Sequence, residues 1–130
     1  MIKIESLVSQ MMHMTVVGRL WHWTTDNAQH HVTYENFLTQ NDNLVDSVVE
    51  SALGNDIAID FSSGVGVQDA KVSSYSVEAS KKALNEYREE VVKFQNSLND
   101  SESRGSTELA TILDDVIELC SKTLYMLRLK

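Results

Sequence analysis

Residues 27–55, NAQHHVTYENFLTQNDNLVDSVVESALGN, are predicted to form the long helix around which the rest of the chain is arranged. Apolar residues recur in this stretch every three or four positions, which is the spacing of one helix face. Thr25, Asp26 or Asn27 can cap the start, and Gly54 is a typical stop, so we expect a helix from about 27 to 53. Its apolar positions are Phe37, Leu38, Leu44, Val45, Val48, Val49, Ala52 and Leu53.

Three further helices are predicted by the same spacing. They cover residues 2–24, residues 75–98 and a last stretch that begins near Ser106. The apolar pattern includes Met11 and Met12 in the first of these and the aromatic residues Tyr87, Phe94 and Tyr125 in the others. The chain of 130 residues has no proline and only five glycines, which argues against the many tight turns of a β fold.

Residues 55–74 lack a clear helical pattern and contain two glycines and four serines, so we expect an irregular connection here, with a short helix inside it as an alternative. Two helices, a long connection and two more helices are the layout of a ferritin-like bundle. The predicted fold class is therefore an all-α, ferritin-like four-helix bundle. It has a long crossover between its second and third helices, and residues 1–130 form a single domain.

Composition limits the functions that the chain can have. The formal net charge of -8 disfavours direct binding to the phosphate backbone of DNA and suits the attraction of metal cations. The single cysteine, Cys120, excludes an intramolecular disulfide, and no apolar run is long enough to span a membrane. We therefore expect a cytoplasmic protein that does not bind membranes.

Histidine and acidic residues lie at helical spacings around the start of the second helix. His22, His30 and His31 surround the expected turn, Glu35 follows His31 by four residues, and a second i, i+4 pair is formed by Asp46 and Glu50. Imidazole together with carboxylate is a ligand set suited to iron and other first-row metals. These residues are therefore candidate metal ligands.

Helix geometry excludes one metal site made from all of them in a single subunit. His31 and Asp46 are separated by about 22 Å along a helix and by a rotation of only about 60°. Two antiparallel copies of the helix, related by a two-fold axis, could bring them together. The motif Glu-x-x-His of ferritin centres within one subunit is absent, so the spacing predicts a site between two subunits or none.

The same residues resemble the Dps proteins, or miniferritins. The pair His22-Trp23 matches the end of that family's first helix, and the offsets from His31 to the acids of the second helix match as well. The last helix shows Ser106-Thr107-Glu108-Leu109 and Leu124-Tyr125-Met126-Leu127-Arg128, which are similar to the family's final helix. The turn before His31 is shorter than usual, and Glu35 stands where the family usually has Asp.

This resemblance implies a ferroxidase that oxidises Fe(II), commonly with hydrogen peroxide, and stores the ferric product in a twelve-subunit cage. The protein would then protect against oxidative stress. Asp46 and Glu50 of one subunit would bind iron together with a second set from its partner, and Trp23 would be a nearby electron donor in catalysis. That second set is His22, His31 and Glu35.

Simpler interpretations of each residue stay open. His22 can be a packing residue at a helix end, Asp46 with Glu50 can be a solvated helix face, and His30 can replace His31 if the helix start rotates. The alternative function is a ferritin-like structural or assembly protein that has lost its metal chemistry.

Overall fold

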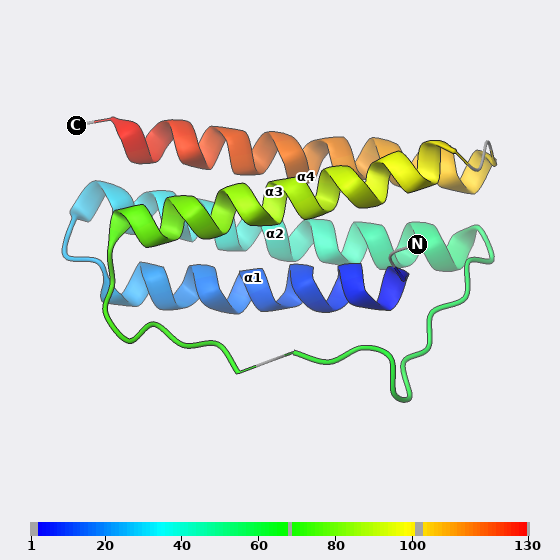
Figure 1. Ribbon diagram of the computed structural model, residues 1–130, viewed down its shortest axis with the longest axis horizontal. Helices are drawn as coiled ribbons and strands as arrows, with labels where there is room; N and C mark the ends of the chain where they lie inside the picture. The colour runs from blue at the N-terminus through cyan, green and yellow to red at the C-terminus, as the bar shows by residue number, and fades with distance from the viewer. Residues whose placement is uncertain (1–2, 68, 101–102, 130) are drawn as a thin grey trace.

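The chain is an all-helical bundle in the computed structural model, which describes residues 3–67, 69–100 and 103–129. The four helices are α1 (Ile4–Thr24), α2 (Ala28–Gly54), α3 (Val77–Asn99) and α4 (Arg104–Arg128) (Figure 1). No strand occurs in these described residues. The prediction of an all-α fold with four packed helices is confirmed.

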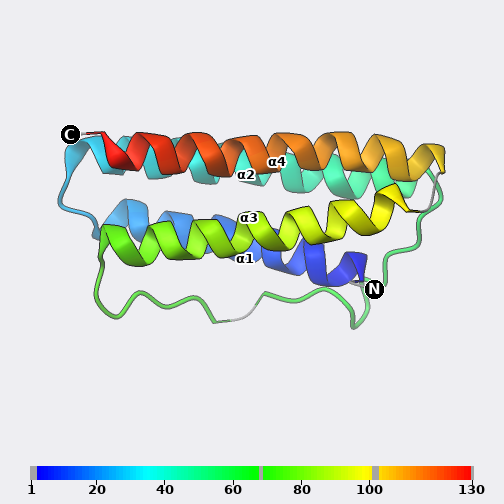
Figure 2. The same cartoon turned by 45° about the horizontal axis from the view of Figure 1, so that its top comes forward.

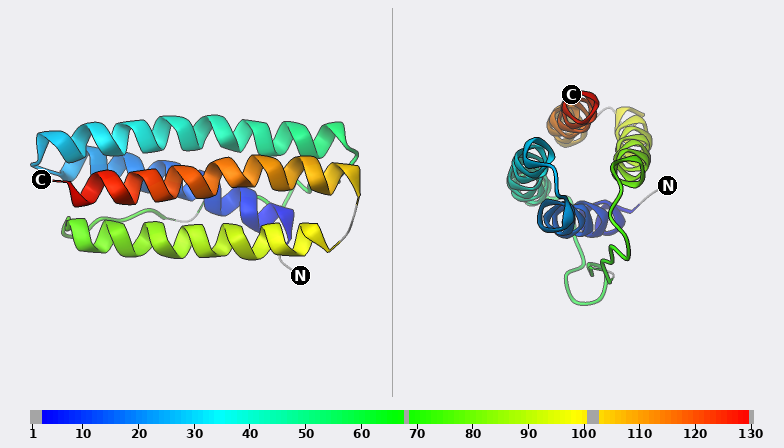
Figure 3. Two further views of the ribbon diagram at one scale, coloured as in Figure 1. Left: turned by 90° about the horizontal axis from the view of Figure 1, so that it is seen from above. Right: turned by 90° about the vertical axis from the view of Figure 1, so that its left-hand side faces the viewer.

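The helices are arranged around the bundle axis in the order α1, α2, α4, α3, as the end-on view in Figure 3 shows. α2 runs antiparallel to α1, and α4 runs antiparallel to α3. The contact between α1 and α3 is the least extensive of the four. Because α2 and α3 run in the same direction, the chain between them must return along the length of the bundle.

Residues 55–67 and 69–76 lie along this return, on the outside of α1 (Figures 1 and 2). They contain turns but no helix, so the alternative of a short helix is wrong for these residues. Two hydrogen bonds hold the connection against α1: the backbone N–H of Asp60 donates to Glu5 Oε2 at 2.9 Å, and that of Gly66 donates to Ser9 Oγ at 3.0 Å.

Large apolar side chains from all four helices form one core. Gly18 lets α1 approach α2 closely, because a Cβ at this position would lie 3.0 Å from Phe37 Cδ2 and 3.3 Å from Leu38 Cβ. None of the helices in the described chain is long and apolar enough to cross a membrane. The largest fully buried residues are Leu7, Val8, Met11, Tyr34, Phe37, Val48, Leu84, Tyr87, Val91, Leu109, Leu113 and Val116.

The start of α2 agrees with the sequence pattern, whereas the start of α4 does not. Asn27 caps α2, since its side chain accepts a hydrogen bond from the backbone N–H of His30. The predicted start of the last helix near Ser106 is wrong. Ser103 is the cap of α4, and its Oγ accepts a hydrogen bond from the backbone N–H of Ser106 at 3.1 Å, so Ser106 lies in the first turn.

Three residues predicted to be in the core lie at the surface. Met12, Leu53 and Tyr125 keep 36%, 49% and 52% of their surface exposed. Met12 and Leu53 belong to pairs of adjacent apolar residues. Successive residues of a helix point about 100° apart, and in these two pairs one member turns outward while the other faces the core. The buried neighbours are Met11 and Ala52.

Candidate metal site at the turn between α1 and α2

A short, well-bonded turn joins α1 to α2. The backbone N–H of Thr25 donates to Trp21 O at 3.0 Å, and that of Asn27 donates to Thr25 Oγ1 at 3.2 Å. The backbone N–H of His30 also donates to Asn27 Oδ1. These bonds define the path of residues 25–27 between the helices. The last turn of α1 and the first turn of α2 therefore lie side by side.

His22 and His31 meet across this turn. Their ring centroids are 3.7 Å apart and the ring planes make an angle of 23°, which is a stacked arrangement. His22 Nδ1 lies 2.8 Å from the backbone oxygen of His31, and His31 Nδ1 lies 2.7 Å from the backbone oxygen of His22. The shortened turn thus places the two predicted histidines in direct contact.

The two hydrogen bonds determine which nitrogen of each ring can bind a ligand. A carbonyl oxygen only accepts, so each Nδ1 carries a proton and donates it. In a neutral ring, the lone pair is then on Nε2. Metal-binding histidines usually hold their other ring nitrogen in this way, because a bond to a carbonyl sets both the tautomer and the ring orientation. His22 and His31 therefore each offer one Nε2 as a possible ligand.

The predicted carboxylates do not join the two histidines within one subunit. Glu35, Asp46 and Glu50 are all exposed on α2, one turn, four turns and five turns beyond His31. In residues 3–67, 69–100 and 103–129 no group of three or more His, Cys, Asp or Glu side chains is close enough to hold a metal ion. One subunit thus brings together two of the five predicted ligands.

His30 and Trp23 are placed differently from the histidine pair. The His30 ring lies edge-on to Tyr34, with centroids 6.3 Å apart, so the structure pairs His31 and not His30 with His22. Trp23 is 65% exposed, and the guanidinium of Arg19 lies over its ring at 5.9 Å from the centroid. Trp23 is therefore accessible at the surface, and it follows His22 directly in the sequence.

A buried polar group behind the turn was not predicted from the sequence. The hydroxyl of Tyr34 lies 2.6 Å from that of Tyr75 and 2.7 Å from Ser80 Oγ, and burial raises the pKa of Tyr34 well above its usual value. Trp21 packs against Tyr34 with ring centroids 5.4 Å apart. Tyr75 is 41 residues from Tyr34, and no local spacing could have indicated this contact.

Exposed apolar residues follow one side of α1, and one more lies on the side of α2 that carries the predicted acids. Met12, Val16 and Trp23 follow one another along one side of α1, and helix rotation places Leu53 of α2 on the side that carries Glu35 and Asp46. Large apolar side chains grouped on a surface often mark a contact with another protein. We call this surface, with Arg19, Glu35, Asp46 and Glu50 included, the α1–α2 flank.

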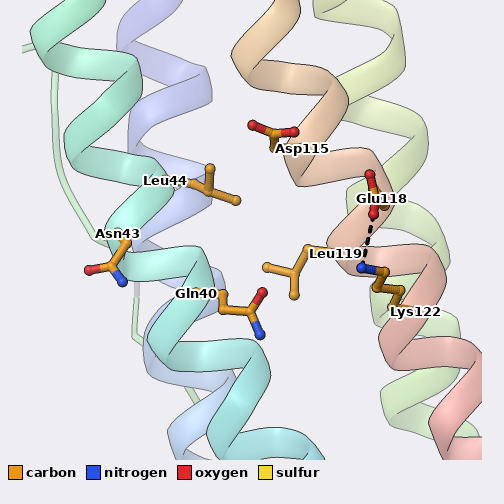
Figure 4. Close-up of a pocket in the computed structure, with 7 residues that line it drawn as sticks. All are labelled: Gln40, Asn43, Leu44, Asp115, Glu118, Leu119 and Lys122. Atoms are coloured by element: carbon orange, nitrogen blue, oxygen red, sulfur yellow. Dashed lines mark ion pairs between the residues drawn. The ribbon is translucent and has the colours of Figure 1, made fainter.

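A groove lies between α2 and α4 (Figure 4). Gln40 and Asn43 line it from α2, and Asp115 lines it from α4. Its only ion pair among the residues drawn joins Lys122 Nζ to Glu118 Oε1 at 2.9 Å. None of the predicted ligands lines this groove.

Residues 22–127 match the model of a protein family described as "Family of unknown function (DUF5856)". The chain belongs to this family. The part of the chain that matches the DUF5856 model starts at His22 and includes every residue of the predicted metal site. Searches among curated proteins and among solved structures found no match.

Proposed function

We propose that two copies of the chain associate through the α1–α2 flank and oxidise Fe(II) at their interface, as a Dps-like miniferritin subunit of ferritin-like topology. The observation that carries this proposal is the pair formed by His22 and His31, whose Nδ1 atoms donate to carbonyls and leave both Nε2 atoms for ligands. The parallel direction of α2 and α3, joined by a long external connection, supports the ferritin-like topology.

The positions of the exposed residues support a two-fold contact. For His31 to meet Asp46 and Glu50 of the partner, the axis must cross α2 near its midpoint, close to Thr39. The residues of α1 at this level are those around Met11 and Thr15, because Asn41 of α2 hydrogen-bonds to both. The neighbouring exposed residues Met12 and Val16 would then meet their own copies across the axis, in a self-complementary apolar contact.

The reaction assigns a distinct role to each part of this interface. The imidazoles of His22 and His31 and the carboxylate of Glu35 bind Fe(II) from one subunit, and Asp46 and Glu50 bind it from the other. One molecule of hydrogen peroxide takes one electron from each of two Fe(II) ions and is reduced to water. The ferric product hydrolyses, releases protons and accumulates inside a cage of subunits. Trp23, which is exposed and follows His22 in the chain, can supply an electron when only one Fe(II) is bound.

Removal of the two carboxylates tests the iron chemistry. The variant replaces both acids, as Asp46→Ala with Glu50→Ala. The initial rate of Fe(II) oxidation by peroxide, measured by ferric absorbance, should fall more than roughly tenfold. Loss of even a residue that hydrogen-bonds to a metal ligand has an effect of that size. The matched control removes two acids at the same spacing on α3, which carries none of the predicted ligands, as Glu86→Ala with Glu90→Ala. An unchanged rate in the first variant would contradict the proposal.

A second variant distinguishes this proposal from the alternative function, that of a structural or assembly protein without metal chemistry. Val16→Glu places two carboxylates near each other across the proposed axis. Because they repel each other, the dimer should dissociate, and Fe(II) oxidation should be lost with it. Val67→Glu, a change at an exposed valine of the connection, is the control. Dissociation in Val16→Glu combined with an absence of iron oxidation in the wild-type protein would favour the structural function.

A further inference from the structure

A cavity of about 600 Å³ lies between α1, the first half of α3 and residues 71–76 of the connection. It is on the side of the bundle where α1 and α3 have their least extensive contact. A second cavity of about 500 Å³ adjoins it, because Gln10 and His13 line both. Neither cavity includes a residue of the candidate metal site.

The connection that borders the larger cavity is bonded to the bundle on both sides of it. Gly66 is bonded to Ser9 of α1 before the cavity, and the hydroxyl of Tyr75 is bonded to that of Tyr34 after it. The next residue, Ser76, caps α3 by accepting a hydrogen bond from Ala79 N at 3.0 Å. The connection is therefore bonded to the bundle before and after the residues that line the cavity.

The walls of the cavity combine apolar and polar side chains. Met14, Val17 and Trp21 of α1, with Ala83 of α3, form an apolar floor. The connection contributes Lys71 and three serines, Ser73, Ser74 and Ser76. A pocket with an apolar floor and a few grouped polar atoms is the usual form of a site for a small organic molecule.

His13 adds a polar group without a partner. Its Nδ1 is buried and has no hydrogen-bond partner among the described residues. A buried polar atom without a partner destabilises the folded protein, so its presence in a native protein needs an explanation. Since His13 lines both cavities, a bound molecule that contacts its ring can complete its hydrogen bonding.

Lys71 offers a binding group for an anionic head. Lys71 takes part in none of the ion pairs found within residues 3–67, 69–100 and 103–129, so its ammonium group can bind a ligand. The serine hydroxyls and the amide of Gln10 supply further donors. Glu86 is the one acidic side chain among the described lining residues.

We propose that this cavity binds a small amphipathic organic anion, whose apolar body rests on Trp21 and Ala83 and whose charged head contacts Lys71 and His13. The site is independent of the iron chemistry, because no lining residue is among the candidate metal ligands. The ligand class is that of aromatic or aliphatic carboxylates and sulfonates of a size that fits about 600 Å³.

Two dyes with the same ring system test the proposal. The anionic probe is 8-anilinonaphthalene-1-sulfonate, and the uncharged probe is N-phenyl-1-naphthylamine, which lacks only the sulfonate. Fluorescence titration of the full chain should show one sulfonate dye bound per chain, and the uncharged dye should bind more weakly. Equal affinity for the two dyes would overturn the anionic assignment, and no saturable binding of either would overturn the site.

Variants of the lining residues locate the binding. Lys71→Gln should weaken binding of the sulfonate dye roughly two- to fivefold, the effect of a partly exposed ion pair, and Glu86→Gln should strengthen it. The matched control is Lys122→Gln, a lysine that lines the groove between α2 and α4 (Figure 4) and should leave the affinity unchanged. If Lys71→Gln and Lys122→Gln have the same effect, the dye does not bind in this cavity.

A filled cavity gives an independent result. Ala83→Trp places a large side chain on the floor and should abolish binding while the helical circular dichroism spectrum is retained. Lys71→Gln changes an exposed residue and keeps the test valid if Ala83→Trp fails to fold. Undiminished binding to a folded Ala83→Trp variant would refute the proposal.

Discussion

The hydrogen bond between Tyr87 and Asn41 lies at the centre of the bundle and offers a quantitative test of how the helices are held in register. Both residues are fully buried. The Tyr87 hydroxyl donates to Asn41 Oδ1 at 2.6 Å, and Asn41 Nδ2 donates to Met11 O at 2.9 Å and to Thr15 Oγ1 at 2.8 Å. This network connects α3, α2 and α1 at the level of the proposed two-fold axis.

The variant Tyr87→Phe removes one oxygen atom and leaves Asn41 Oδ1 buried without its partner. Such a loss destabilises a protein by about 1–3 kcal/mol. Burial raises the pKa of Tyr87 well above its usual value, so the hydroxyl is a donor at all ordinary pH values. For a chain of 130 residues the entropy of unfolding is about 0.27 kcal/mol per K, and the expected decrease in Tm is about 4 to 11 °C.

A double-mutant cycle separates this hydrogen bond from simple loss of packing. Asn41→Leu alone leaves the Tyr87 hydroxyl without an acceptor, whereas Asn41→Leu with Tyr87→Phe removes both polar groups. The double variant should therefore be less destabilised than the sum of the single variants, by about 0.5–3 kcal/mol. Urea unfolding followed by circular dichroism at one fixed protein concentration measures this difference. Additive effects of the two changes would refute the reasoning.

Three further variants or reactions test other parts of the structure. Burial raises the pKa of the Cys120 thiol to about 12, so the thiol should react with a disulfide reagent only after denaturant unfolds the chain, and fast labelling of the native protein would contradict this. Asn27→Ala should lower the free energy of unfolding by about 1 kcal/mol through loss of the α2 cap, whereas Asp26→Ala, which removes no cap, should have little effect. His13→Leu should raise the free energy of unfolding of the ligand-free protein, because it replaces a buried nitrogen without a partner. A decrease in the urea concentration at the unfolding midpoint would contradict this.

The helices were predictable because their signals are local. Apolar spacing identified all four, and Asn27 could be recognised as one of three possible caps. The start of α4 was misplaced because Ser103 and Ser106 are three residues apart and both are suitable cap residues. Met12 and Leu53 were misplaced because spacing alone does not show which member of an adjacent apolar pair turns outward.

The contact between His22 and His31 depends on geometry that residue spacing does not contain. The nine-residue separation indicated a short turn, but the reciprocal bonds from each Nδ1 to the opposite carbonyl follow from the exact path of that turn. The interaction of Tyr34 with Tyr75 depends on where a long irregular connection rejoins the bundle. Such contacts are decided by tertiary packing, so no local pattern could predict them.

The most direct test of the central claim is a crystal structure of the protein soaked anaerobically with Fe(II), with anomalous scattering measured at the iron edge. The proposal predicts two-fold related iron peaks between antiparallel copies of α2, in contact with Nε2 of His22 or His31 from one subunit and with Asp46 and Glu50 of the partner subunit. Iron bound only elsewhere, for example in the groove between α2 and α4, or copies of α2 that do not meet across a two-fold axis, would contradict it.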